Sequence, residues 1–398
     1  MTPVQSYLNK LCIELPHRHV GSRENQIATD FFAETIASFG FSVERPQFEC
    51  IDWMADSAAK LQADDEAFQP FVSPYSLSYN GSASLVEAAS IEALEAKDVS
   101  GKLLLMHGAL VKEQLMPKNF PFYNPEHHQQ IYNLLEQKQP AAIIAATGRN
   151  PELAGAWYPF PLFEDGDFDI PSVYMTDVEG ERLLQHVGTP VTLSFESQRI
   201  PSTGCNVIAT KGANTSPRLV FCAHIDSKQS TPGALDNGTG VIILLLLAEL
   251  LSDYSGNTRI EILAVNGEDY YGANGEIEYV KSNQGKFDDI LLAINMDLAG
   301  HRASHTIYSL FGCPEPMITQ LHTIFGQGHN FAEGPEWYQS DHSIFIQNGR
   351  PAVAITSSDF MELSTEITHT EKDVPALVDD QKLVEIAHSL RDVALALR

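Results

Sequence analysis

Positive charge, long apolar runs and cysteine are all scarce in this chain of 398 residues. Lysine and arginine number 25 against 52 acidic residues, which gives a formal net charge of -27. A surface of this kind repels phosphate backbones, so nucleic acid is excluded as an expected partner. Solubility is the simplest reason for the acidity.

Apolar runs are too short to suggest a membrane protein. The longest one covers residues 241–248 and ends at Glu249. A membrane-spanning helix needs about 18 or more such residues, so no membrane association is expected. The opening residues MTPVQSYLNKLCIELPHRHV lack a basic start followed by an apolar core, and we therefore expect no secretory signal.

The cysteines argue against a disulfide framework, because five is an odd number and their spacing is not paired. Cys222 lies two residues before His224, within LVFCAH, where a small buried thiol is the simpler interpretation than a metal ligand. We therefore expect a reducing, cytoplasmic location. The cysteines are Cys12, Cys50, Cys205, Cys222 and Cys313.

A chain of this length exceeds one ordinary core, so we expect two compact units. Apolar residues at helical spacing predict helices over 5–15 and 24–39, followed by a strand-like run over 41–50. From about residue 56 the character changes to short strands with helices between them. The predicted strands are 102–106, 141–146, 173–175 and 191–195, and the predicted helices are 128–139 and 178–186.

From Cys205 onward, strands alternate with helices. The predicted strands are 207–209, 219–223, 260–265, 291–296, 306–311 and 353–356, and the predicted helices are 241–252, 274–282, 315–325 and 382–397. This alternation predicts an α/β fold with a mostly parallel, doubly wound sheet and helices on both faces.

Metal-capable side chains gather where these predicted strands end. Such ends meet at one edge of a parallel sheet, where ligands bind. Asp236 precedes the helix expected near residue 239, a position that suits a carboxylate. The residues are His224, Asp226, Asp236, Glu268, Asp269 and Asp297, with His369 further along in THTEKD.

Taken singly, most of these residues have an ordinary explanation. His224 could be a buried hydrogen-bonded histidine, Asp236 an N-cap, and His369 a loop residue. Glu268-Asp269 could be a solvated turn. Asp297 is harder to dismiss, because an unpaired buried carboxylate is costly. Together on one sheet edge, imidazoles and carboxylates favour a pair of divalent metals, and this ligand set suits zinc.

The motifs CAHIDS, PGALDNGTGV, NGEDYYGANG, INMDLAG, SDHSIF, GRPAVAITSS and THTEKDVP occur in this order. Over about residues 202–398 the chain thereby closely resembles the two-zinc aminopeptidases and carboxypeptidases of metallopeptidase family twenty-eight. The resemblance implies the following roles: Asp236 bridges two Zn²⁺ ions, His224 and Asp297 complete one site, Asp269 and His369 complete the other, Glu268 is the general base on a water between the metals, and Asp226 orients His224.

One departure from the family pattern concerns the metal. Many members place Glu-Glu where this chain has Glu268-Asp269, so the second ligand is one methylene shorter. Co²⁺ or Mn²⁺ stays open beside Zn²⁺ for that reason. Asp341-His342 begins a predicted helix and is not counted among the ligands. Trp337 and Tyr338 before it could form a substrate wall or an oxyanion donor, or could simply pack.

Between residues 56 and 201 the chain contains the segments VSGKLLLMHG, AAIIAATG, DIPSVYMTDVEGERLL and PVTLSFES. With these segments it resembles, more weakly, the protease-associated domain inserted in some members of that family. We therefore expect a discontinuous zinc exopeptidase domain, 1–55 and 202–398, interrupted by a smaller α+β insert. A structural insert or a dimer contact is the alternative for this segment, and self-association into a homo-oligomer stays open.

The expected function is a two-zinc metallo-exopeptidase, most simply an aminopeptidase acting on peptides with a free amino terminus. A carboxypeptidase would need a positive anchor, for which Arg302 and Arg350 are the nearby candidates, and a dipeptidase is a further alternative. A single-zinc acyltransferase similar to glutaminyl cyclase and a non-catalytic binding protein on the same scaffold are further alternatives. A pure binding protein has no need of a base such as Glu268.

Overall fold

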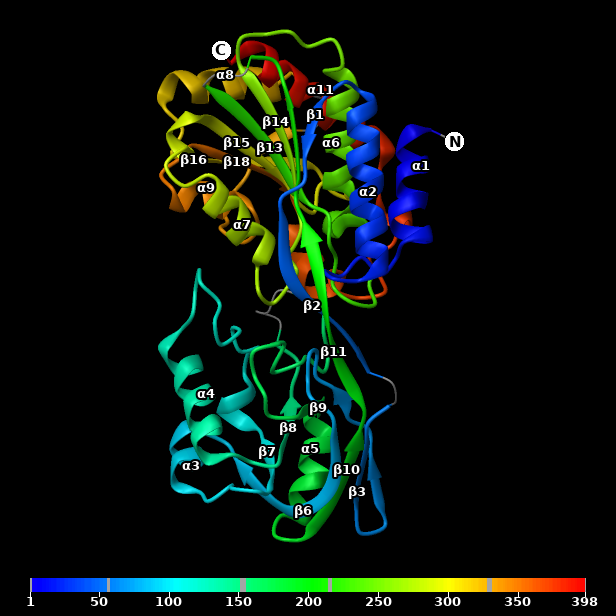
Figure 1. Ribbon diagram of the computed structural model, residues 1–398, viewed down its shortest axis with the longest axis vertical. Coiled ribbons are helices and arrows are strands. Elements are labelled where there is room, and N and C mark those ends of the chain that lie inside the picture. Colours follow the sequence, from blue (N-terminus) through cyan, green and yellow to red (C-terminus); the bar gives the residue numbers. More distant parts are fainter. Residues whose placement is uncertain (1, 56–57, 151–154, 214–216, 328–330, 398) are drawn as a thin grey trace. The chain divides into compact units, whose positions relative to one another are not determined.

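The computed structural model describes residues 2–55, 58–150, 155–213, 217–327 and 331–397. The chain divides into two compact units (Figure 1). Unit 1 contains Met1–Cys50, Ala154–Ala156 and Thr203–Arg398, and unit 2 contains Ile51–Leu153 and Trp157–Ser202. The chain leaves unit 1 within β2 (Gln47–Ala55) and returns within β11 (Ser197–Cys205), and these two strands pair with each other.

Unit 1 is built on a mixed eight-stranded sheet. In spatial order its strands are β1 (Ser42–Glu44), β12 (Val207–Lys211), β14 (Arg259–Val265), β13 (Arg218–His224), β15 (Ile290–Met296), β18 (Ala352–Ser357), β16 (Thr306–Phe311) and β17 (Phe331–Glu333). The four central strands, β14 to β18 in this order, run parallel, whereas β12 and β16 join them antiparallel. The carboxyl ends of the central strands therefore share one edge.

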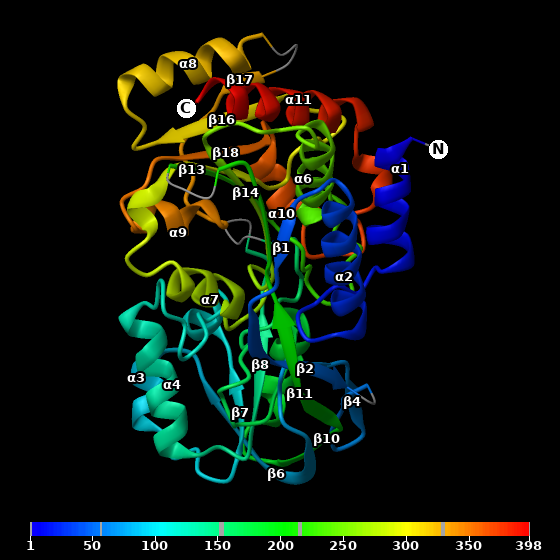
Figure 2. The same ribbon diagram turned by 45° about the horizontal axis from the view of Figure 1, so that its top comes forward.

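Helices cover both faces of this sheet, as the sequence predicts (Figures 1 and 2). On one face α6 (Thr239–Leu250) packs against α11 (Asp380–Ala396), α2 (Arg23–Ser38) and α1 (Pro3–Leu8), which continues as a π-helical segment, Asn9–Glu14. On the other face α7 (Asn274–Ser282) meets α9 (His342–Gln347) through Tyr279 and Phe345, whose ring centroids are 5.7 Å apart. The remaining helices are α8 (Glu315–Phe325) and α10 (Phe360–Glu366).

The α6 helix anchors the core of unit 1. Residues Thr239–Ala248 are all buried, and no charged residue occurs before Glu249. A helix that is apolar on every side must be surrounded by other elements, and each buried leucine or isoleucine contributes about 1.5–3 kcal/mol. At its first turn Gly240 has no room for a side chain, because a Cβ would lie 2.4 Å from Asn237 Oδ1 and 2.6 Å from the Met296 carbonyl oxygen.

Unit 2 has its own eight-stranded sheet. The spatial order is β4 (Glu66–Phe68), β3 (Lys60–Ala63), β10 (Pro190–Phe195), β6 (Tyr79–Ala88), β7 (Leu103–Met106), β8 (Ala142–Thr147), β9 (Ser172–Thr176) and β5 (Phe71–Val72). The strands β6 to β9 are parallel, and the others pair antiparallel. Side chains of α3 (Ile91–Ala96) and α4 (Glu126–Lys138) pack in one apolar cluster, and Leu183 of α5 (Asp177–Leu183) packs in another.

The five cysteines are not paired in disulfides, as their odd number and unpaired spacing predict. Cys222 is fully buried in β13, which agrees with its interpretation as a small core residue. None of the helices in the described ranges combines the length and the apolar character that crossing a bilayer requires.

Candidate metal centre

The predicted metal-capable residues meet at the carboxyl edge of the central strands of unit 1. His224 is the last residue of β13, Glu268 and Asp269 follow β14, and Asp297 follows β15 directly. These three strands are neighbours and run parallel, so their ends are adjacent. Asp236 joins them from the segment Ala234–Gly238, which leads directly into α6.

His224, Asp236 and Asp297 form one set of donors. His224 Nε2 lies 3.2 Å from Asp236 Oδ1 and 3.7 Å from Asp297 Oδ1. The three ligand atoms lie within 4.8 Å of one another, and all three residues are buried. Such spacing is compatible with one metal ion bound between them.

A second set consists of Asp236, Asp269 and His369. His369 Nε2 lies 3.1 Å from Asp236 Oδ2 and 3.0 Å from Asp269 Oδ1. His369 comes from the loop after α10 and has a left-handed backbone, with φ of 62°. The two oxygens of Asp236 therefore face different histidines, so this carboxylate is common to both sets of donors.

Glu268 lies beside these donors without belonging to either set. Its Oε2 atom is 4.0 Å from His224 Nε2, and its side chain keeps 23% of its surface exposed against 3% for Asp269. Adjacent acidic residues thus differ in access: Asp269 is enclosed, and Glu268 is open to an incoming molecule. This division is what a separate base and ligand require.

Asp226 contacts both His224 and the turn that follows β14. Its carboxylate accepts hydrogen bonds from the backbone N–H groups of Gly267, at 2.7 Å, and Asp269, at 3.1 Å. His224 Nδ1 lies 3.2 Å from the Asp226 carbonyl oxygen and 3.7 Å from its carboxylate. The main chain of Asp226 is thus the closer partner of the imidazole, and its side chain holds the turn that carries Glu268 and Asp269.

The donor set fits divalent cations on electrostatic grounds. Burial raises the pKa of Glu268 well above its usual value, and the charges of Asp269 and Asp297 add to this, while His224 opposes it. Burial and the charge of Asp236 likewise raise the pKa of Asp269. Asp269 Oδ2 and Asp297 Oδ1 are buried and receive no hydrogen bond from any described residue. Cations would compensate this negative charge and occupy these lone pairs.

His342 is engaged away from these donors. Its Nε2–H donates to the Trp337 carbonyl oxygen at 2.7 Å, and the indole of Trp337 packs against Phe360 with ring centroids 5.4 Å apart. The Tyr338 side chain is 55% exposed, and its hydroxyl donates to Glu336. In this arrangement Trp337 is a packing residue, and the Tyr338 hydroxyl is occupied by a surface contact.

Two side chains that sequence reasoning missed support the donors. Asp373 is fully buried, and its carboxylate receives the backbone N–H groups of Leu235 and Asp236. Asn237 follows Asp236 directly, and its amide donates to the Met296 carbonyl oxygen at 2.8 Å. Asp373 lies in the motif THTEKD and Asn237 in the motif LDNG. Their hydrogen bonds join residues 59 or more positions apart, and contacts over such separations produce no pattern in the sequence.

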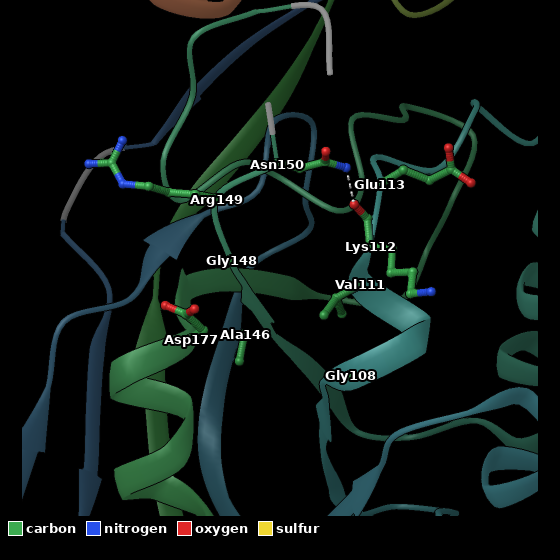
Figure 3. Close-up of a pocket in the computed structure, with 9 residues that line it drawn as sticks. All are labelled: Gly108, Val111, Lys112, Glu113, Ala146, Gly148, Arg149, Asn150 and Asp177. Atoms are coloured by element: carbon green, nitrogen blue, oxygen red, sulfur yellow. Dashed lines mark hydrogen bonds between the residues drawn. The ribbon is translucent and has the colours of Figure 1, made fainter. Parts of the chain in front are cut away.

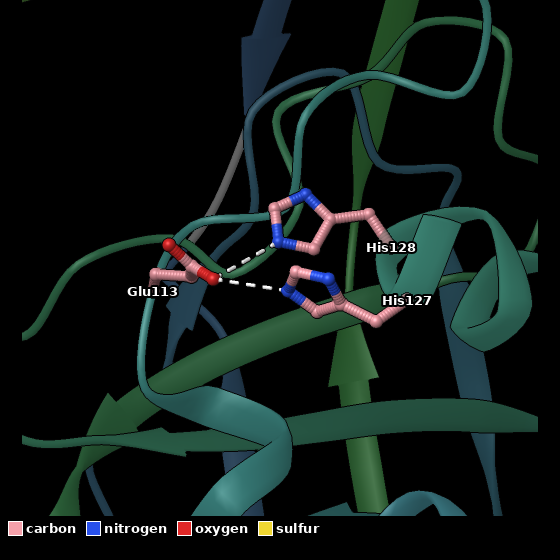
Figure 4. Close-up of side chains that lie close together, drawn as sticks. All are labelled: Glu113, His127 and His128. Atoms are coloured by element: carbon pink, nitrogen blue, oxygen red, sulfur yellow. Dashed lines mark hydrogen bonds and ion pairs between the residues drawn. The ribbon is translucent and has the colours of Figure 1, made fainter. Parts of the chain in front are cut away.

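Unit 2 holds another group of metal-capable side chains, which the sequence did not suggest. Glu113 Oε1 lies 3.1 Å from His127 Nε2 and 3.2 Å from His128 Nε2 (Figure 4). His128 Nδ1 accepts the backbone N–H of Met116 at 3.0 Å, so a neutral His128 carries its proton on Nε2 and donates it to Glu113. A metal would have to displace that proton, and hydrogen bonding therefore explains this group.

Unit 2 also contains a cavity of about 620 Å³ near the ends of β7 and β8 (Figure 3). The side chains of Arg149 and Lys112 extend in opposite directions there, and Asn150 donates to the Lys112 carbonyl oxygen at 2.6 Å. The acidic residues Glu113 and Asp177 also line this cavity. The cavity is thus lined by charges of both signs that do not point to a common position, and this arrangement does not indicate a class of ligand.

The fold of unit 1 thus places two candidate sets of metal donors at one edge of its sheet. Residues 206–394 match the model of Peptidase family M28, so this segment is a domain of that family, and it indicates a metallopeptidase. The predicted family resemblance and enzyme class are thereby confirmed.

Curated relatives carry related names. The chain is 26% identical over 360 residues to the probable leucine aminopeptidase 2 of Aspergillus fumigatus, covering 84% of this chain and 67% of that protein. It is 25% identical over 287 residues to the probable lipoprotein aminopeptidase LpqL of Mycobacterium tuberculosis, covering 71% and 54%. The chain thus spans little more than half of the mycobacterial relative.

Solved structures establish the fold. An aminopeptidase from Aneurinibacillus sp. strain AM-1 superposes with a TM-score of 0.73 at 22% identity, covering 97% of this chain and 92% of that one. A zinc aminopeptidase from Bacillus subtilis superposes with a TM-score of 0.74 at 18% identity, covering 98% and 94%. The α/β architecture predicted from the sequence is confirmed over nearly the whole chain.

Proposed function

We propose that this protein is a two-zinc aminopeptidase that removes amino-terminal residues from peptides. The observation that carries the proposal is the position of Asp236, whose two carboxylate oxygens lie 3.2 Å and 3.1 Å from the Nε2 atoms of His224 and His369. One carboxylate shared by two sets of donors is the arrangement that a closely spaced metal pair needs.

The zinc ions, when bound, would polarise the scissile carbonyl group and acidify a water molecule. Glu268 takes a proton from the attacking water at its carboxylate and passes it to the departing amine. Asp226 keeps Glu268 and Asp269 in their respective directions through the N–H groups on either side of Glu268. Burial of His224, Asp269 and Asp297 excludes bulk water from the donors.

The placement of the arginines supports an aminopeptidase over a carboxypeptidase. Arg350 donates to the carbonyl oxygen of Ile290, the first residue of β15, whereas Asp297 follows the last residue of that strand. A strand of seven residues spans roughly 20 Å, so Arg350 lies at the wrong end to anchor a substrate carboxylate. Arg302 donates to the Val378 carbonyl oxygen and is engaged there. The names of the relatives point the same way.

Unit 2 is proposed to be a protease-associated type of insert that influences substrate access. Its own sheet and its place between the two parts of unit 1 in the sequence support this assignment. The lack of disulfides among the five cysteines supports a reducing compartment, which we propose to be the cytoplasm.

A substrate panel on zinc-reconstituted enzyme tests the proposed activity. Leucine p-nitroanilide and dipeptides with a free amino terminus should be hydrolysed, whereas their N-acetylated counterparts should not. Metal analysis of the same preparation should give two ions per chain. One tightly bound zinc together with cyclisation of amino-terminal glutamine would instead identify an acyltransferase similar to glutaminyl cyclase, and hydrolysis of N-blocked peptides from their carboxyl end would identify a carboxypeptidase.

A further inference from the structure

Asp373 ties together two of the segments that supply donors. Its Oδ1 accepts the backbone N–H of Leu235 at 2.8 Å, and its Oδ2 accepts that of Asp236 at 3.0 Å. The Asp373 carbonyl oxygen accepts a third N–H, from Ala234, at 3.2 Å. Asp373 lies four residues after His369. The loop that carries His369 is therefore also hydrogen-bonded to the backbone at Asp236, whose carboxylate is common to both sets of donors.

The opposite side of Asp236 is held by Asn237. The Asn237 side chain donates to the Met296 carbonyl oxygen at 2.8 Å and accepts the backbone N–H of Gly240 at 3.0 Å. Met296 directly precedes Asp297, so this contact fixes the distance between two donor-bearing segments. Asp236 is consequently held through the backbone before it and through the side chain after it.

The segment just before Asp236 is fixed in addition by a buried guanidinium. Arg18 has an exposed fraction of 1% and donates to the carbonyl oxygens of Pro232 and Gly233, both at 2.8 Å. Carbonyl groups of this segment thus face Arg18, while the N–H groups that follow face Asp373. The carbonyl oxygens and N–H groups of this segment are therefore hydrogen-bonded. Rotation about the backbone preceding Asp236 would break several of these buried hydrogen bonds.

We propose that Asp373 is a positioning residue, which sets the direction of the Asp236 carboxylate so that its two oxygens face the two sets of donors. This role rests on the proposed two-metal function. Its test measures metal affinity and not peptide hydrolysis, so the two proposals can fail separately. Because Asp236 belongs to both sets, a change at Asp373 should weaken both metal sites together. A change at a residue of one set alone, such as Asp269, should weaken mainly one.

The substitution D373N tests this assignment with little change in volume. The amide retains one acceptor oxygen, but its NH₂ group would face the second backbone N–H, so the two-point contact is lost. The full-length protein is stripped of metal with a chelator and titrated with Co²⁺ by visible absorption and with Zn²⁺ by calorimetry. Partners outside the ligand shell typically alter metal affinity by about 10- to 100-fold, and we expect both binding steps of D373N to weaken within that range.

D379N is the matched control. Asp379 is also an aspartate whose carboxylate accepts a backbone N–H, that of Gln381 at 3.0 Å, but it caps the start of α11. Its substitution should leave both binding steps unchanged. A positioning role also predicts that the activity of D373N recovers at high metal concentration, which a general loss of structure would not allow.

Three results would overturn the proposal: wild-type affinity at both sites of D373N, weakening of only one site, or activity that excess metal does not restore. If D373N does not fold, D373S provides the same test, since its hydroxyl can accept one of the two N–H groups. Failure of both variants to fold would make Asp373 a general core residue and refute the positioning role. A wild-type protein that binds two ions and cleaves no peptide would refute the aminopeptidase alone.

Discussion

Replacing Glu268 with glutamine should remove most peptide hydrolysis and leave the metal donors in place. Glu268 Oε2 lies 4.0 Å from His224 Nε2, and this carboxylate belongs to neither set of donors. Glutamine has nearly the same shape, so the partly exposed position can accept it without repacking. Its amide cannot take a proton from water, and the reaction loses its base while the bound metals are retained.

The magnitude follows from the role assigned to this carboxylate. Positioned general bases accelerate reactions by about 10²- to 10⁴-fold. At about 1.36 kcal/mol for each factor of ten, the barrier should rise by about 2.7–5.4 kcal/mol. The full loss should appear in kcat, because KM depends on donors that the substitution leaves unchanged.

The assay is hydrolysis of leucine p-nitroanilide under saturating zinc, with bound metal measured on the same sample. Glu278→Gln on α7 is the matched control, because its partly exposed carboxylate accepts the Ser282 hydroxyl at 2.8 Å and belongs to neither set of donors. A Glu268→Gln enzyme with two ions per chain and a kcat within about threefold of wild type would refute the assignment of the base. Loss of one ion would instead make Glu268 a ligand.

Three further predictions concern metal, packing and pH. Exhaustive chelation should abolish hydrolysis, and zinc or cobalt should restore it; activity that survives chelation would contradict a metal-dependent mechanism. Leu245→Ala in the fully buried α6 should lower the free energy of unfolding by about 2–5 kcal/mol in chemical denaturation, whereas Leu395→Ala, 47% exposed, should have little effect. Burial lowers the pKa of His128, although Glu113 acts in the opposite direction. Below about pH 6.5 this histidine is therefore protonated in the unfolded chain but not in the folded chain, which favours unfolding. The melting temperature should therefore fall between pH 7 and pH 5, and His128→Asn should reduce that fall; an equal fall in both proteins would exclude this histidine as the cause.

The central strands of unit 1 were predictable because a strand that is buried on both faces appears in the sequence as a continuous run of apolar residues. The run RLVFCAH is buried throughout as β13, and AVAITS is buried throughout as β18. Since parallel strands expose their carboxyl ends at one edge, the polar residues that follow them could be assigned to a common site before their distances were known.

Strands with mixed burial were not predictable in the same way. In β6 the residues Tyr79–Leu85 alternate between exposed and half-buried positions until Leu85, and the sequence YNGSAS resembles a turn. It becomes a strand because β10 pairs with its first half and β7 with its second half. Such pairing is a tertiary contact that local sequence does not record.

The contacts that hold the site were likewise hidden from the sequence. Asp373 and Asn237 act on backbone atoms far away in the chain, and no spacing rule connects a carboxylate with a peptide N–H more than 130 positions away. The pairing of Glu113 with His127 and His128 was missed for the same reason, although these histidines are adjacent in sequence. Residue types predicted which groups could bind metal, and only the fold determines which of them are held in place.

The backbone before position 269 determines where the short carboxylate of Asp269 lies. Gly267 has φ of 131°, a conformation that side-chain-bearing residues rarely adopt, so the chain turns sharply after β14. Asp226 fixes that turn through the N–H groups of Gly267 and Asp269. The turn brings Asp269 close enough for its Oδ1 to lie 3.0 Å from His369 Nε2. With the turn in this position the aspartate at 269 reaches the second set of donors, and the longer Glu268 beside it stays outside both sets.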